Sequence, residues 1–141
     1  MKNEYVKDWM TPQTITIHEE ATLPDAHELM KEYGIRRLPV VDGNGKLKGI
    51  ISQTDVREAQ PSDATSLSIY ELNYLLAKLR VKKVMTANVS TVMAESSVAD
   101  AARIMLEQKI GGLPVVDDKG KLVGIITESD VFRMVVKLYA E

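Results

Sequence analysis

The stretch Leu38-Pro39-Val40-Val41-Asp42 returns 75 residues later as Leu113-Pro114-Val115-Val116-Asp117. The same offset aligns residues 6–57 with residues 81–132 without a gap, and 24 of the 52 aligned pairs are identical. Chance does not produce such a match, so the chain contains two copies of one unit of about 50 residues. A unit of that size holds a poor core alone, which predicts that the copies pack together with approximate two-fold symmetry. Four shorter segments of the first copy also return at this offset: Val6-Lys7, Met10-Thr11, Gly49-Ile50-Ile51 and Asp55-Val56.

Each copy shows the periodicity of a strand, a helix, two strands and a second helix. The short β-rich runs at 13–17 and 88–92 predict the first strand of each copy. Two apolar runs joined by Asp42-Gly-Asn-Gly45, and their counterparts around 117–120, predict a hairpin. A second helix should follow each Asp-Val, ending at Glu58 in copy one and running to the C-terminus in copy two. The fold class is therefore α+β, a mixed α/β fold of two β-α-β-β-α repeats.

The first helix of each copy has recognisable ends. Thr22 is a candidate N-cap with Pro24 in the first turn, and Ser97 holds the same position in copy two. Gly34 suits the left-handed residue that closes the helix, whereas copy two has Lys109 there. Apolar residues lie on one face of each helix: Ala26, Leu29, Met30 and Tyr33, and then Ala101, Ile104 and Met105.

We expect repeat one at residues 1–60, a connecting loop and helix at 61–80, and repeat two at 81–141. Within the connection, 60–65 is a loop, and Ser68 with Glu71 forms a capping box. Two helical stripes of apolar residues could finish the core of the monomer or form a symmetric dimer interface. Their members are Ile69, Leu72, Leu75, Leu76 and Leu79, and then Val131, Phe132, Val135, Val136, Leu138 and Tyr139.

Composition excludes several classes of protein. With 141 residues, 45% hydrophobic and 27% charged, the chain is typical of a globular protein, and no apolar run is long enough to span a membrane. The first ten residues lack the apolar region of a secretory signal. Cysteine is absent, which fits the reducing cytoplasm and removes disulfides and thiolate metal ligands. A net charge of −2, from 18 basic and 20 acidic residues, disfavours nucleic-acid binding.

The pattern resembles a tandem pair of cystathionine β-synthase (CBS) domains, the arrangement called a Bateman module. Three elements carry the resemblance in both copies: the Met-Thr opening, the Leu-Pro-Val-Val-Asp strand, and Gly-Ile-Ile-[Ser/Thr]-x-x-Asp-Val. It covers the whole chain except the connection between the copies. The sequence is also similar to stand-alone regulators of the acetoin-utilisation type, which usually carry an extra C-terminal domain that is not seen here.

The resemblance implies regulation rather than catalysis. CBS pairs bind AMP, ADP, ATP, S-adenosylmethionine or sometimes NAD in the cleft between the repeats, and they report to a partner protein. The family implies no required cofactor or metal, and it implies a homodimer built from helices.

The carboxylates of Asp55 and Asp130 are candidates for binding a ribose, because a carboxylate can accept hydrogen bonds from both the 2′ and the 3′ hydroxyl. Ser52 and Thr127, three residues earlier, lie where a strand passes into a helix and can meet a phosphate there. The alternative is structural: Asp55 and Asp130 could merely cap the helix that follows.

The family places the adenine base against the first strand and the residues before Leu-Pro. One predicted site combines Thr86, Thr91 and Ile110 with Ser52 and Asp55, and the other combines Thr11, Thr16 and Ile35 with Thr127 and Asp130. The full base-side set that the resemblance implies is Thr11, Thr14, Thr16, Ile35 and Arg36 in copy one, and Thr86, Val89, Thr91, Ile110 and Gly111 in copy two.

The copies differ just before Leu-Pro, where Arg36-Arg37 is replaced by Gly111-Gly112. Arginine is the best side chain for binding a phosphate, although two arginines at the start of a strand could simply face solvent. We expect the Asp55 site to favour phosphorylated nucleotides, and the Asp130 site to take less charged adenosyl ligands or none.

The sequence bears on three other functions. No nucleotide-cradling, metalloprotease or serine-hydrolase motif occurs, and His18 and His27 are expected to be exposed, so catalysis is disfavoured. An interaction scaffold with vestigial nucleotide sites remains open, because every family motif also serves the fold. Nucleic-acid binding would rest on a small basic cluster at Lys78, Arg80, Lys82 and Lys83, which a helix end also explains.

Overall fold

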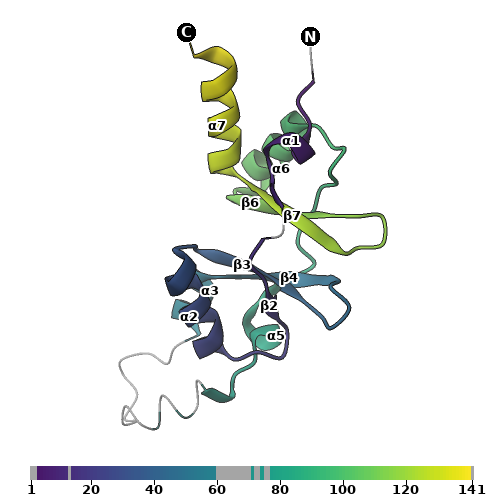
Figure 1. The fold of residues 1–141 in the computed structure, drawn as a ribbon. Coiled ribbons are helices and arrows are strands. Elements are labelled where there is room, and N and C mark those ends of the chain that lie inside the picture. Colours follow the sequence, from purple (N-terminus) through teal and green to yellow (C-terminus); the bar gives the residue numbers. More distant parts are fainter. Residues whose placement is uncertain (1–2, 13, 60–70, 72–73, 75–76, 141) are drawn as a thin grey trace. The chain divides into compact units, whose positions relative to one another are not determined.

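The computed structural model describes residues 3–12, 14–59, 71, 74 and 77–140, and the chain divides into two compact units. Residues 15–88 form one unit, here called the Asp55 unit, and residues 1–14 with 89–141 form the other, the Asp130 unit. Each unit has a sheet and its own helices (Figure 1), which confirms the mixed α+β fold class. The predicted two-fold packing of the repeats stays a prediction.

In the Asp55 unit the strands follow the order β2-β3-β4-β5. β2 pairs in parallel with β3, whereas β3 with β4 and β4 with β5 are antiparallel. Leu38, Val40 and Ile51 are completely buried and pack with the apolar face of α2. The elements are β2 (Ile17–His18), α2 (Leu23–Tyr33), β3 (Arg37–Val41), β4 (Leu47–Ser52), α3 (Gln53–Glu58), α5 (Val81–Val84) and β5 (Thr86–Ala87).

The Asp130 unit repeats this plan. Its strands follow the order β1-β7-β6 with both pairs antiparallel, and Val92 makes an isolated parallel bridge to Val115 at the β6 edge. Leu113, Val115 and Ile126 are completely buried beneath α6. The elements are α1 (Val6–Trp9), β1 (Thr11–Pro12), α6 (Val98–Gln108), β6 (Gly112–Val116), β7 (Leu122–Thr127) and α7 (Glu128–Tyr139).

The hairpins and the predicted ends of the first helix in each copy are confirmed. The second helices begin at Gln53 and Glu128, two residues before Asp-Val, and not after it as predicted, because Ser52 and Thr127 are the N-cap residues. The Thr22 hydroxyl accepts from the Asp25 N–H at 3.3 Å, and the Ser97 hydroxyl accepts from the Asp100 N–H at 3.0 Å. Gly34 closes α2 at φ +64°, in the left-handed region that glycine adopts without strain. Lys109 takes the same conformation at the end of α6, so the helix ends alike in both copies despite the different residue.

The opening segment of each copy packs in the unit that is built from the rest of the other copy. Residues 3–12 lie in the Asp130 unit, where β1 pairs with β7, and residues 81–87 lie in the Asp55 unit, where β5 pairs with β4. Val6 and Val81, one from each opening, are completely buried in their hosts. Both sheets are therefore completed by exchange.

The same backbone hydrogen bonds anchor both openings. The Val81 N–H donates to the Ala21 carbonyl at 2.7 Å, and the equivalent Val6 N–H donates to the Ser96 carbonyl at 2.8 Å. The Lys82 and Lys7 N–H groups likewise donate to the carbonyls of Glu19 and Ala94. Equivalent donors and acceptors are 75 residues apart, so the exchange is symmetric.

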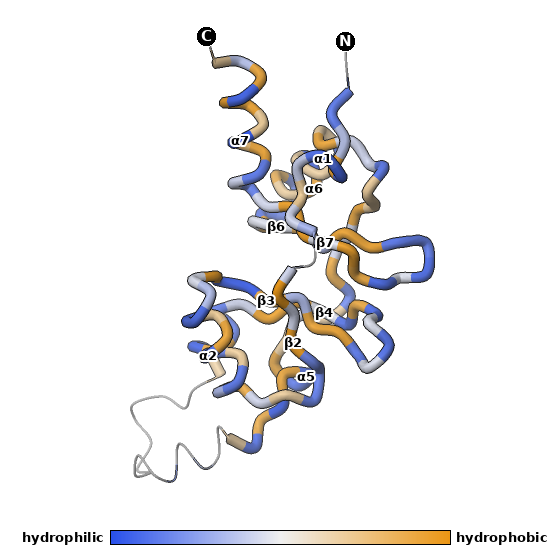
Figure 2. The backbone as a smooth tube through the Cα atoms, viewed as in Figure 1, coloured by the Kyte–Doolittle hydropathy of each residue, from blue (hydrophilic) through white to orange (hydrophobic). Residues whose placement is uncertain are grey.

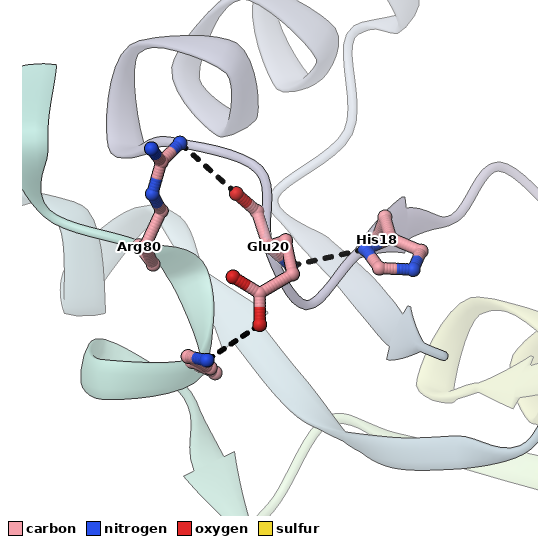
Figure 3. Close-up of polar contacts among 4 residues, drawn as sticks. His18, Glu20 and Arg80 are labelled. Atoms are coloured by element: carbon pink, nitrogen blue, oxygen red, sulfur yellow. Dashed lines mark hydrogen bonds and ion pairs between the residues drawn. The ribbon is translucent and has the colours of Figure 1, made fainter. Parts of the chain in front are cut away.

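Side chains around Glu20 reinforce the anchor in the Asp55 unit (Figure 3). Arg80 Nη1 donates to the Glu20 carbonyl at 3.2 Å, and the Glu20 N–H donates to His18 Nδ1 at 3.0 Å. Lys82 Nζ donates to the Glu20 carboxylate, and this hydrogen bond holds the pKa of that carboxyl below its usual value. The basic cluster near Lys82 therefore has a structural role in this unit.

Three expectations about the fold were wrong or only partly met. The first strands are shorter than predicted: β2 begins at Ile17, and only Val92 of 88–92 forms a bridge. The reason is that the chain passes from one unit to the other at 14–15 and at 88–89. Tyr33 does not join the buried face of α2, because 52% of it is exposed.

The apolar stripe of α7 does not complete the core. Of the two alternatives for this stripe, a core of the monomer or a dimer interface, the first is therefore wrong for α7. Of this stripe, Val131 packs against the core, as does Met134 elsewhere on α7. Phe132 is 64% exposed, Val136 65% and Tyr139 78%. Figure 2 shows hydrophobic and hydrophilic residues alternating along α7.

Several expectations about the connection fall outside the described residues. Leu79 is described and packs against the core of the Asp55 unit. The repeat boundaries at 60 and 80 follow chain order and stay a prediction. The predictions outside the described part are the loop at 60–65, the N-cap Ser68, and Ile69, Leu72, Leu75 and Leu76.

Adding a Cβ at Gly49 or Gly124 should destabilise the protein, because these glycines face the backbone of the exchanged strands. A Cβ at Gly49 would lie 2.5 Å from the Thr86 carbonyl oxygen, and one at Gly124 would lie 2.7 Å from that of Thr11. We expect Gly49→Ala and Gly124→Ala each to lower the free energy of unfolding by about 1–3 kcal/mol in urea denaturation. Gly43→Ala, which meets open space, is the control. Two variants as stable as this control would contradict the close approach.

The hairpin turns predict a stability loss in acid. The Asp42 carboxylate accepts from the Asn44 N–H at 2.8 Å, and the Asp117 carboxylate accepts from the N–H groups of Lys121 and Lys119 at 2.9 Å. These bonds favour the ionised form, so the pKa of both carboxyls lies below the ordinary 3.8. Because the unfolded chain takes up these protons first, the stabilisation is complete above about pH 4 and is lost as the pH falls through the folded pKa.

We expect the stability advantage of the wild type over an Asp42→Asn, Asp117→Asn double variant to be constant above about pH 4 and to shrink as the pH falls below that value in chemical denaturation. Asp118→Asn, at an exposed neighbour, is the control. An advantage that does not change with pH would contradict the turn bonds.

Candidate ligand-binding site

The corner between β4 and α3 holds Ser52 and Asp55 in a reciprocal cap. The Ser52 N–H donates to Oδ2 of Asp55 at 2.8 Å, and the Asp55 N–H donates to the Ser52 hydroxyl at 3.1 Å. Asp55 is half-buried. Among the described residues, no hydrogen-bond partner is found for its second oxygen, Oδ1. The cap therefore uses one oxygen of this carboxylate and leaves the other available.

The start of the Leu-Pro strand lies against this corner. Arg37 is the antiparallel partner of Ser52, and the Gln53 N–H donates to the Arg36 carbonyl at 2.8 Å. Arg36 is exposed, and Arg37 is half-buried. The fold thus places the backbone of Arg36 and Arg37 beside Ser52, three residues before Asp55. Guanidinium, hydroxyl and carboxylate groups are the chemistry that a ribose phosphate requires.

The corner between β7 and α7 repeats the backbone but not the side chains. Gly112 is the partner of Thr127, and the Glu128 N–H donates to the Gly111 carbonyl at 3.1 Å. Oδ2 of Asp130 accepts from the Thr127 N–H at 2.8 Å and from the Thr127 hydroxyl at 3.2 Å. Oδ1 of Asp130 accepts from Arg133 Nη1 at 2.7 Å, and Asp130 is only 4% exposed.

Both carboxylates therefore cap helices, as the structural alternative stated. Capping does not decide against ligand binding at Asp55, because the cap uses Oδ2 and no described residue binds Oδ1. At Asp130 both oxygens have protein partners. Arg133 was missed from the sequence, although its spacing of three residues from Asp130 on a helix was a usable signal.

The remaining predicted residues are divided between the two units. Thr86 joins Ser52 in one sheet, because β5 pairs with β4, and Thr11 likewise joins Thr127, because β1 pairs with β7. Asp55 follows Ser52 in α3. The Asp55 unit also contains Thr16, Ile35, Arg36 and Arg37, and the Asp130 unit also contains Thr14, Val89, Thr91, Ile110 and Gly111. The two predicted combinations each need residues from both units, and they stay predictions.

A hollow of about 220 Å³ lies between α6 and α7. Its lining is mostly apolar and includes Met105, Leu106, Val131 and Phe132. Of the predicted site residues, Ile110 belongs to this lining. The hollow continues the exposed apolar surface of α7.

The structure adds no sign of a metal centre. His18 and His27 are exposed, as expected. No cluster of three metal-ligating His, Asp or Glu side chains occurs within the described ranges. Among the same residues, no helix is long and apolar enough to cross a membrane.

The sequence profile of the CBS domain matches twice, at residues 6–62 and 81–137. The chain belongs to the CBS domain family. A CBS domain-containing protein of Dictyostelium discoideum is 37% identical over 133 residues, covering 94% of this chain and 92% of that protein. The chain is also 33% identical to part of an L-aspartate semialdehyde sulfurtransferase of Methanocaldococcus jannaschii, but it spans only 23% of that enzyme's length.

Solved CBS structures share the fold. An acetoin utilization protein (AcuB) of Vibrio cholerae aligns with a TM-score of 0.81 at 36% identity, covering 97% of this chain and 93% of that one. CBSX2 in complex with AMP gives 0.80 at 34% identity, with 96% and 98% covered. The CBS pair of protein MJ0100, in complex with 5′-methylthioadenosine and S-adenosyl-L-methionine, gives 0.80 at 31% identity, with 97% and 99% covered.

Proposed function

We propose that the protein is a regulatory module that binds an adenosine-containing ligand with residues of both CBS repeats and signals to a partner protein. The observation that carries the proposal is the Asp55 corner, where an unused carboxylate oxygen, the Ser52 hydroxyl and Arg36 with Arg37 come together. Two similar CBS structures contain AMP or S-adenosyl-L-methionine, which supports this ligand class. The module needs no cofactor and acts in the cytoplasm.

Each part of the ligand has a matching group in this proposal. Oδ1 of Asp55 accepts from the ribose hydroxyls, while Oδ2 keeps the helix capped. Arg36 and Arg37 bind the phosphate, and Thr91 and Ile110 of the second repeat contact the base. The ligand transmits a signal because it binds one arrangement of the repeats better than another. No step of this scheme requires bond making or breaking, so the module is not an enzyme.

The rival proposal is an interaction scaffold that no longer binds nucleotides. A thermal-shift screen with AMP, ADP, ATP and S-adenosylmethionine separates the two, because a ligand at a hundred times its Kd adds about 2.7 kcal/mol of stability. Mass spectrometry of material that copurifies with the protein would identify the natural ligand. No shift with any of these ligands would favour the scaffold.

Arg36 and Arg37 should distinguish AMP from adenosine. We expect Arg36→Ala or Arg37→Ala to weaken AMP binding about tenfold or more in isothermal titration, because a charge-assisted bond to phosphate is lost. Adenosine binding should stay unchanged in these variants, whereas Asp55→Asn should weaken both ligands. Arg103→Ala, at an exposed arginine of α6, is the matched control. Unchanged AMP affinity in both arginine variants would refute the phosphate role.

We propose in addition that a second copy of the chain covers the apolar surface of α6 and α7. Phe132, Val135, Val136 and Tyr139 follow helical spacing along one side of α7 and are 44–78% exposed, and Leu106 of α6 is 79% exposed. A stripe of this kind next to a hollow is typical of an interface between proteins. Two copies related by a two-fold axis can bury it against itself.

Val136→Asp should convert the dimer to a monomer in analytical ultracentrifugation, because it places a charge in the stripe that the proposed dimer buries. Met93→Asp changes an apolar residue that is 41% exposed and lies outside α6 and α7, so it serves as the control. A Val136→Asp variant that sediments like the wild type would contradict this interface.

A further inference from the structure

The two homologous carboxylates differ in what holds them. Oδ1 of Asp130 accepts from Arg133 Nη1 at 2.7 Å, and its Oδ2 accepts twice from Thr127. Asp55 has the same backbone bond at Oδ2, but among the described residues nothing binds its Oδ1. Both oxygens of Asp130 therefore have hydrogen-bond partners in the protein, whereas the described partner of Asp55 binds Oδ2 alone.

The difference comes from the residue three positions after each aspartate. The offset of 75 places Glu58 of the first repeat opposite Arg133 of the second. Residues three apart on a helix are neighbours, so Arg133 attracts Asp130, whereas Glu58 repels Asp55. The first repeat thus cannot make the same ion pair.

The ion pair between Asp130 and Arg133 bears on ligand binding because Asp130 is buried. The Asp130 side chain is 5% exposed, so its charge benefits from a partner, whereas the Arg133 side chain is 64% exposed and reaches it from the solvent side. A ribose that approached Asp130 would compete with Arg133 for Oδ1. Because the guanidinium is already in place, the ligand must displace it before its own hydroxyls can donate.

We propose that Arg133 is a latch on the second ribose acceptor, so that the chain has one open site, at Asp55, and one latched site, at Asp130. This inference rests on the proposed adenosyl-binding function and specifies which of its two sites fills first. Arg133 acts here as a specificity-determining residue that reduces ribose binding at its own carboxylate.

The chain offers a matched control for the latch. Arg103 Nη1 contacts Asp100 Oδ1 at 2.8 Å with the same spacing of three residues, but this carboxylate is 61% exposed and belongs to no predicted site. Arg103→Gln removes an ion pair of the same kind without touching Asp130. Glu58→Arg provides the converse test, because it places the latch residue beside Asp55.

The test counts sites by equilibrium dialysis with AMP and, separately, with uncharged adenosine. The wild type should bind one ligand per chain before the second, weaker site fills. Arg133→Gln should tighten the second site about tenfold or more, Glu58→Arg should weaken the first by a similar factor, and Arg103→Gln should change neither. Circular dichroism melting confirms that each variant is folded.

The possible failures are distinguishable. If the wild type binds ligand at its first site and Arg133→Gln leaves the second site unchanged, the latch is wrong and the adenosyl-binding function stands. If wild type and all variants bind neither AMP nor adenosine, the proposed function is wrong and the latch falls with it. Equal weakening by Arg103→Gln and Glu58→Arg would also overturn the latch, because it would show a general charge effect.

Discussion

The close approach of the exchanged strands to Gly49 and Gly124 is the constraint on which both units depend. Each glycine lets a strand of the other repeat's opening lie against the sheet, with a backbone oxygen where a Cβ would otherwise be. The buried Val6 and Val81 follow these strands into the host cores. A single repeat without its partner would lack one strand and one buried core residue of its unit.

Local structure was predictable because its signals lie within a few residues of one another. Thr22 caps α2, Gly34 closes it, and Asp42 organises the hairpin turn, each through bonds to near neighbours. The exchange could not be predicted in this way. The 75-residue repeat gives the same sequence pattern whether an opening segment packs on its own copy or on the other copy. The reason is that both hosts present equivalent residues to Val6 and Val81.

The candidate site was predictable in part for the same reason. Ser52 and Asp55 were expected together because they belong to one motif, and the strand register then placed Arg37 opposite Ser52. The combination of these residues with Thr91 and Ile110 stays a prediction, because Thr91 and Ile110 belong to the other unit. Arg133 lies one residue beyond the aligned repeats 6–57 and 81–132, and its contact with Asp130 comes from one helical turn after the Asp-Val motif.

Duplication explains how two equivalent corners can acquire different electrostatics. The backbone bonds are equal: the Gln53 and Glu128 N–H groups both tie the helix start to the residue before Leu-Pro. In the first repeat, Arg36 and Arg37 lie at the start of the strand, and Glu58 lies one turn after Asp55 on the helix. In the second, the strand starts with two glycines, and Arg133 lies one turn after Asp130. In the proposed function, the arginines beside Ser52 meet the phosphate of a ligand, whereas Arg133 meets the protein's own carboxylate. The same backbone thus supports a proposed ligand corner in one repeat and a self-paired corner in the other.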